Sequence, residues 1–147
     1  MSAPNAERDH APTRPLILIV EDDAAVGSMI DDYLIGAGFR TARAGDGREA
    51  VERVSDLRPD LIIMDLMMPR LTGGEAARKL RDDPLTTHIP ILGISAVADI
   101  TTIAEMLPID SVLPKPFDLD DLLAAIHGLL AAPDEPSSGG AVTSASQ

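Results

Sequence analysis

Three short runs of apolar residues stand in the middle of this sequence and limit the folds open to it. Leu16–Val20 reads LILIV, Leu61–Met64 reads LIIM and Ile89–Ile94 reads IPILGI. None of them alternates apolar with polar side chains, so a strand formed by each would be buried on both faces. Strands of this kind belong to a parallel sheet that helices cover on each side. The pattern predicts an α/β fold.

Two weaker segments, Phe39–Ala44 and Ser111–Leu113, complete a set of five predicted strands, and the first alternates like an edge strand. Helical patterns separate the strands, and the expected helices are 26–34, 46–57, 74–81, 99–106 and 119–130. Gly36 and Gly38 are expected to end the first helix, and Asp118 to cap the last. Five βα units imply right-handed crossovers and a site beyond the carboxyl ends of the strands.

Composition separates the two ends of the chain from its centre. Residues 1–14 are polar, and residues 132–147 are rich in Pro, Ser, Gly and Ala without an apolar period. Both segments are expected to be disordered tails. Residues 15–131 are then expected to form one domain. The 16 residues after that domain are too few to build a DNA-binding effector and show no apolar period, so we expect a stand-alone domain or a piece of a longer protein.

Charge and cysteine content exclude several classes of function. The formal net charge of -12 argues against a general nucleic-acid or anionic-membrane binder, whose affinity rests on Lys and Arg. The absence of cysteine excludes disulfides, thiolate metal sites and cysteine nucleophiles. The N-terminus has no apolar stretch of signal-peptide length, so a cytoplasmic location is expected.

Polar side chains follow four of the predicted strands at one edge of the predicted sheet. They are Glu21, Asp22 and Asp23 after the first strand, then Asp65, Ser95 and Lys115. Each alone has a plain explanation as a loop, cap, turn or solvated residue, except Asp65. Apolar residues flank Asp65 on both sides, and a buried carboxylate without a partner is costly. The convergence of acids and a lysine at one edge predicts a site there.

The motifs ILIVEDD, DLIIMDLMMPRLTGGE, HIPILGISA and VLPKPF, in this order, resemble the receiver domain of two-component response regulators over about residues 16–130. The resemblance implies a flavodoxin-like doubly wound fold with strand order 2-1-3-4-5. It implies that Asp65 takes a phosphoryl group from a histidine kinase or a histidine phosphotransfer protein. The protein then switches a downstream protein partner or relays the phosphate. It is not a conventional enzyme, but it would catalyse its own phosphorylation and dephosphorylation.

The resemblance also assigns the cation site. Mg²⁺, for which Mn²⁺ can substitute, would bind Asp22 and Asp65 directly, the backbone carbonyl of Met67, and Glu21 through water. Asp23 would then cap the next helix, and a register in which Asp22 and Asp23 form the acidic pair is the alternative. No nucleic acid or membrane partner is expected, and the protein should be a monomer or weak homodimer.

The remaining family positions bear on the response to phosphorylation. Lys115 would supply positive charge to the phosphoryl oxygens. The Ser95 hydroxyl would move toward the phosphoryl group, and the peptide bond before Pro116 should be cis. Val112 stands where the family usually has an aromatic switch residue, and the span from Ser95 to Lys115 is short by about half a helical turn. We therefore expect a switch that uses Ser95 without an aromatic rotamer change.

Met67 and Val97 occupy the positions that flank the path of an attacking water in receivers. Neither side chain can hydrogen-bond a water into place, which predicts a long-lived phosphorylated state. A phosphorylation-independent interaction module on the same fold is the main alternative. A flavin protein lacks support because the first loop is acidic and aromatic residues are few, and a dehalogenase-type phosphatase would need Asp where Met67 stands.

Overall fold

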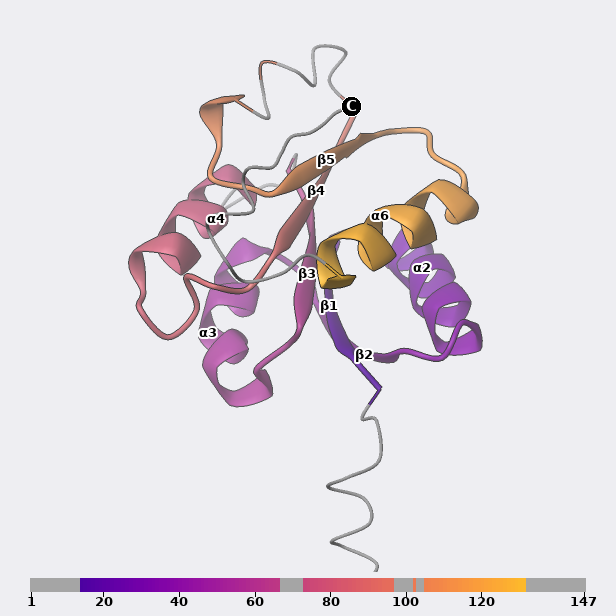
Figure 1. The fold of residues 1–147 in the computed structure, drawn as a ribbon, viewed down its shortest axis with the longest axis horizontal. Helices are drawn as coiled ribbons and strands as arrows, with labels where there is room; N and C mark the ends of the chain where they lie inside the picture. Colours follow the sequence, from indigo (N-terminus) through magenta and orange to yellow (C-terminus); the bar gives the residue numbers. More distant parts are fainter. Residues whose placement is uncertain (1–13, 67–72, 97–101, 103–104, 132–147) are drawn as a thin grey trace, which may run out of the picture.

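The computed structural model describes residues 14–66, 73–96, 102 and 105–131, and within them five parallel strands form one sheet. The strands are β1 (Leu16–Val20), β2 (Arg40–Ala44), β3 (Leu61–Asp65), β4 (Ile91–Ser95) and β5 (Ser111–Pro114). Their order is β2-β1-β3-β4-β5 (Figure 1). This order and the parallel pairing confirm the predicted doubly wound, flavodoxin-like fold.

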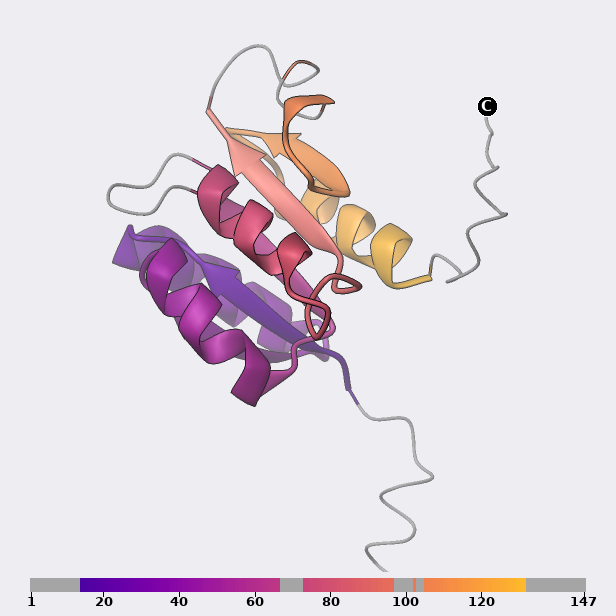
Figure 2. The ribbon, with the colours of Figure 1, turned by 90° about the vertical axis from the view of Figure 1, so that its left-hand side faces the viewer.

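Helices cover both faces of the sheet, as the doubly buried strands require. The helices are α2 (Ala24–Gly36), α3 (Gly47–Leu57), α4 (Gly73–Asp82) and α6 (Leu119–Ala131). Figures 1 and 2 show α3 and α4 on one face, and α2 and α6 on the other. The predicted helix 99–106 lies largely outside the described residues.

Two separate apolar cores result from this layering, one on each face of the sheet. The side chains of β1 alternate between them, since Leu18 faces α3 and α4 while Ile19 faces α2 and α6. All five β1 side chains are buried. Burial on both faces explains why the strand sequence shows no alternation.

Local signals set the helix ends. The Asp23 carboxylate accepts hydrogen bonds from the N–H groups of Ala25 and Val26, at 2.9 and 3.2 Å, and caps α2. Asp46 caps α3 in the same way through Glu49 N–H. Gly36 is the last residue of α2, and Gly38 follows at a φ of 100°, a conformation that favours glycine.

Two predicted strands begin later than expected. β4 begins at Ile91, after Pro90, because proline has no N–H to donate to the ladder. β2 begins at Arg40, and the preceding Phe39 is buried with its ring centroid 5.8 Å from that of His127 on α6. In the part of the chain that the structure describes, no helix is long and apolar enough to cross a membrane.

Candidate functional site

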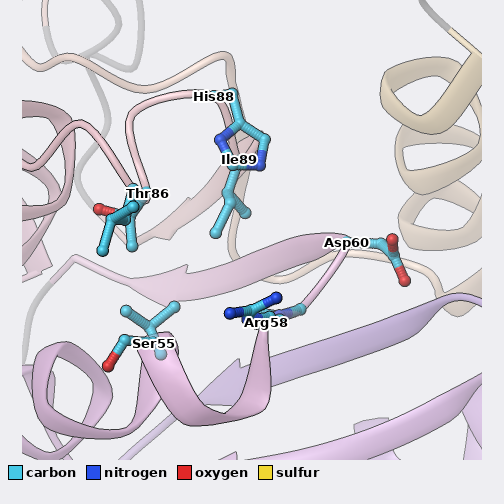
Figure 3. A pocket seen from close by; sticks show the side chains of 9 residues that line it. Ser55, Arg58, Asp60, Thr86, His88 and Ile89 are labelled. Atoms are coloured by element: carbon cyan, nitrogen blue, oxygen red, sulfur yellow. The ribbon is translucent and has the colours of Figure 1, made fainter.

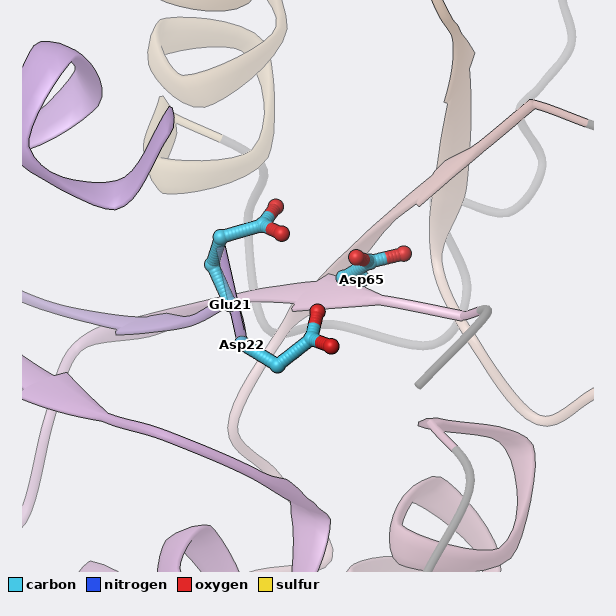
Figure 4. A group of neighbouring side chains, drawn as sticks. All are labelled: Glu21, Asp22 and Asp65. Carbon is cyan, nitrogen blue, oxygen red and sulfur yellow. The ribbon is translucent and has the colours of Figure 1, made fainter. Parts of the chain in front are cut away.

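Three carboxylates meet at the carboxyl edge of the sheet (Figure 4). Glu21 and Asp22 follow β1, and Asp65 is the last residue of the neighbouring strand β3. One carboxylate oxygen from each lies within 4.8 Å of the other two. Glu21 and Asp65 are each only 4% exposed, whereas Asp22 is exposed. Two acids at this point have therefore lost most of their contact with water.

The Lys115 ammonium group faces both buried acids. Lys115 Nζ lies 3.5 Å from Asp65 Oδ2 and 3.6 Å from Glu21 Oε1. The backbone N–H of Lys115 donates to Ser95 O at 2.8 Å, which ties the lysine to the end of β4. The peptide bond between Lys115 and Pro116 is cis. Within the described part of the chain, one positive charge thus stands against three carboxylates, which leaves an excess of negative charge among these residues.

The carboxyl group of Glu21 has a raised pKa. Burial, together with the nearby Asp65 carboxylate, raises the pKa of its carboxyl from 4.5 to about 7, although the backbone N–H of Asp23 and the charge of Lys115 favour the ionised form. Glu21 Oε2 accepts that Asp23 N–H at 3.2 Å, while the buried Oε1 has no hydrogen-bond partner among the described residues. The structure therefore holds a carboxylate oxygen that is buried without full compensation.

The donor set fits a hard divalent cation. Mg²⁺ prefers carboxylate and carbonyl oxygens and is usually bound through one or two carboxylates with several waters. Asp22 and Asp65 can supply two such carboxylates. Glu21 lies beside them in the same cluster and could contact the ion through a water. A cation here would offset the repulsion among the three acids.

Asp23 is not part of the cluster. Its carboxylate is engaged in capping α2, so the acidic pair beside Asp65 consists of Glu21 and Asp22. The alternative register, with Asp22 and Asp23 as the pair, does not fit this geometry. An acidic triplet in sequence thus divides into two residues for the site and one for the helix.

The structure describes two of the four residues predicted to control the response. Ser95 is the last residue of β4, fully buried and opposite Pro114 in the ladder. Val112 lies opposite Gly93, half-buried and packed against the core that faces α3 and α4. Met67 and Val97 lie outside the described residues.

Arg81, which the sequence analysis did not single out, joins three segments near the other end of β4. Its guanidinium donates to Pro108 O at 3.0 Å, to Thr87 O at 2.9 Å and to Ile89 O at 2.7 Å, and it pairs with Asp110. Most of these partners are backbone carbonyls, which leave no mark in a sequence. The one available signal in the sequence was that Arg81 is a basic residue in the last turn of a helix.

A cavity of about 340 Å³ lies away from the carboxylates, where β3 and β4 begin (Figure 3). Its lining includes Arg58, Asp60, Thr86 and His88, and none of the predicted site residues. Two of these side chains serve the fold, because Asp60 accepts from Leu16 N–H at 2.8 Å and Thr86 donates to a backbone carbonyl. The cavity is therefore separate from the acidic cluster.

Comparison with known proteins agrees with this geometry. The sequence profile of the response regulator receiver domain matches residues 17–127. The DNA-binding response regulator MtrA of Mycobacterium tuberculosis is 37% identical over 124 residues, which cover 83% of this chain and 53% of that protein. The chain therefore spans about half the length of the curated relatives it matches.

Solved receiver structures match over almost their whole length. A putative response regulator from Chloroflexus aurantiacus is 34% identical with a TM-score of 0.76, and the match covers 82% of this chain and 100% of that one. The receiver domain of a sensor histidine kinase from Pseudomonas aeruginosa, solved with magnesium in its active-site cleft, is 27% identical. Its TM-score is 0.75, with the same coverage of both chains. The chain belongs to the response regulator receiver domain family.

Proposed function

We propose that this protein accepts a phosphoryl group on Asp65 from a phosphohistidine of a sensor histidine kinase or a histidine phosphotransfer protein. The observation that carries the proposal is a buried carboxylate at a strand end, 3.5 Å from a lysine ammonium and beside two further acids. A carboxylate can act as a nucleophile toward phosphorus and form an acyl phosphate. Family membership supports the same chemistry.

The transfer needs no reactant besides a proton from solvent. An Asp65 carboxylate oxygen forms a bond to phosphorus as the phosphorus–nitrogen bond of the phosphohistidine breaks. The bonding electron pair returns to the imidazole nitrogen, which takes up a proton. Phosphoryl transfer depends on positioning and on neutralising charge more than on covalent catalysis. Lys115 is placed to neutralise the phosphoryl oxygens as they approach Asp65.

A divalent cation, Mg²⁺ or Mn²⁺, completes the proposed site. Asp22 and Asp65 would hold it directly, with the Met67 carbonyl as a further ligand and Glu21 acting through water. The bound ion supplies positive charge to the phosphoryl oxygens. Without it, an anionic phosphodonor would meet a cluster with excess negative charge.

Ser95 would transmit the effect of phosphorylation. It is the last residue of β4 and lies opposite Pro114 at the end of β5. We propose that its hydroxyl engages the phosphoryl group and shifts the segments leading to Lys115, and that a downstream protein detects this change. Val112 has no aromatic ring, so the response would not involve an aromatic rotamer change.

A labelling experiment tests the proposal. With Mg²⁺ and a small-molecule phosphodonor, the wild-type protein should gain one phosphoryl group by intact mass, and Asp65→Asn should gain none. Asp23→Asn is the matched control, since asparagine also caps helices and the residue lies outside the cluster. Equal labelling of wild type and Asp65→Asn would overturn the assignment.

A further inference from the structure

Gly73, the first residue of α4, lies against the main chain of Asp65. A Cβ added at Gly73 would overlap the carbonyl oxygen of Asp65, and would stand 2.8 Å from Leu66 Cα and 3.0 Å from Met64 Cγ. Two of these three atoms belong to the backbone and cannot turn away as a flexible side chain could. The start of α4 therefore packs directly on the end of β3.

The backbone conformation does not explain the glycine. Among the described residues, Gly38 is the glycine with a positive φ, and Gly73 adopts an ordinary helical conformation. Glycine is also a poor helix former, so the helix itself would favour alanine here. What requires glycine at this position is the space beside Asp65.

The neighbouring strand β4 also holds the Asp65 backbone. Asp65 lies opposite Ile94 in the ladder between β3 and β4, and Leu66 N–H donates to Ile94 O at 2.9 Å. The main chain that carries the Asp65 carboxylate is thus held between β4 and the first residue of α4. Movement on the α4 side would displace the carboxylate relative to Lys115 and Glu21.

We propose that Gly73 is a positioning residue for the phosphoryl-acceptor carboxylate: its missing side chain sets where Asp65 stands. This inference rests on the proposed function of Asp65. A methyl group at Gly73 must push the Asp65–Leu66 backbone by several tenths of an ångström. A displacement of about 1 Å at a reacting group can reduce a rate by about 100-fold, so we expect a loss of about 10- to 100-fold.

Gly74 offers a matched control in the next position. A Cβ added there would meet only the side chain of Leu107, at 3.0 and 3.4 Å, and that side chain can shift. Gly73→Ala and Gly74→Ala make the same chemical change in the same turn of α4, with the same gain in helix propensity. They differ in whether the new methyl group meets the Asp65 backbone.

The test compares the single-turnover phosphorylation rate constant of wild type, Gly73→Ala and Gly74→Ala at saturating Mg²⁺ and small-molecule phosphodonor. Rates are expressed per folded molecule, measured by circular dichroism. A lower rate for Gly73→Ala by tenfold or more, with Gly74→Ala within about twofold of wild type, is expected. If Gly73→Ala is partly unfolded, the assay is repeated in trimethylamine N-oxide, which favours the compact state.

Equal rates per folded molecule for the two variants would overturn the inference and leave Gly73 a role in folding alone. Failure of the wild type to be phosphorylated would instead refute the proposed function of Asp65. The two failures are therefore distinguishable within one experiment.

Discussion

At the scale of single residues, the site is set by how one lysine and three acids share a small, mostly buried space. Asp65 and Glu21 are almost fully buried, and Lys115 Nζ lies almost equally far from the two carboxylates. Asp22 is exposed, so a cation bound to its carboxylate could also bind water molecules. Among the described residues the three acids carry more negative charge than Lys115 balances, and a divalent cation at this point would offset the excess.

The division of labour between Asp22 and Asp23 can be tested by parallel alanine substitutions. Asp22→Ala should weaken Mg²⁺ binding by about tenfold or more, because a carboxylate ligand is lost. Asp23→Ala should leave Mg²⁺ affinity nearly unchanged but cost about 1 kcal/mol of stability, because α2 loses its cap. Calorimetric Mg²⁺ titration and urea unfolding measure the two effects. The reverse order of Mg²⁺ affinities would contradict the assignment.

The raised pKa of Glu21 makes a prediction about stability in Mg²⁺-free buffer. The pKa rises from 4.5 to about 7 on folding, so between these values the folded state holds a proton that the unfolded state has released. Stability therefore falls as pH rises through this window, by at most about 3 kcal/mol from this group. The contribution of Glu21 to the free energy of unfolding is fully present below pH 4.5 and is lost above pH 7.

Urea unfolding of wild type and Glu21→Gln between pH 5 and 8 measures this effect. The neutral amide does not titrate, so the variant should lose less stability than wild type as pH rises. Saturating Mg²⁺ should reduce the difference, since the ion favours the charged carboxylate. If the free energies of unfolding of wild type and Glu21→Gln changed in parallel with pH in Mg²⁺-free buffer, Glu21 would not be protonated in the folded state.

At the scale of elements, Arg81 connects α4 to the segments that enter β4 and β5. Its side chain is 19% exposed and donates to backbone carbonyls just before β4 and just before β5. Its partner Asp110 also accepts a hydrogen bond from Ile91 N–H at 2.7 Å. This network fixes where β4 begins and where the chain returns toward β5. It thereby supports the two strands whose far ends carry Ser95 and lead to Lys115.

Arg81→Ala should lower the free energy of unfolding by about 2–3 kcal/mol, because several carbonyls and the Asp110 carboxylate lose a charged donor. Arg78→Ala, an exposed arginine on the same helix, should change it by less than about 0.5 kcal/mol. Urea unfolding of both variants is the measurement. A similar small effect for both would mean that water replaces the Arg81 contacts without loss.

At the scale of the whole molecule, two apolar cores join a five-stranded sheet to four described helices, and the site lies on one edge of that sheet. The buried apolar strands predicted the parallel sheet and the edge at which the polar residues meet, and the resemblance to receiver domains predicted the strand order. Such strands carry a strong signal because both of their faces must be apolar.

Other features could not be predicted because their partners are distant backbone atoms. The carbonyls around Arg81 and the close approach of Gly73 to Asp65 depend on main-chain geometry, which side-chain patterns do not record. The beginning of β4 after Pro90 was missed by two residues, since an apolar run does not show where the ladder starts. The helix expected at 99–106 and the roles of Met67 and Val97 stay predictions.

The most direct test of the central claim is to locate the phosphoryl group chemically. Borohydride reduces an acyl phosphate to an alcohol, so a phosphorylated aspartate becomes homoserine while free carboxylates stay unchanged. After phosphorylation with Mg²⁺ and a small-molecule donor, peptide mass spectrometry should find homoserine at position 65 and aspartate at that position in the unphosphorylated control. Reduction at Glu21 or Asp22, or a phosphoryl group on a histidine with position 65 unchanged, would contradict the account.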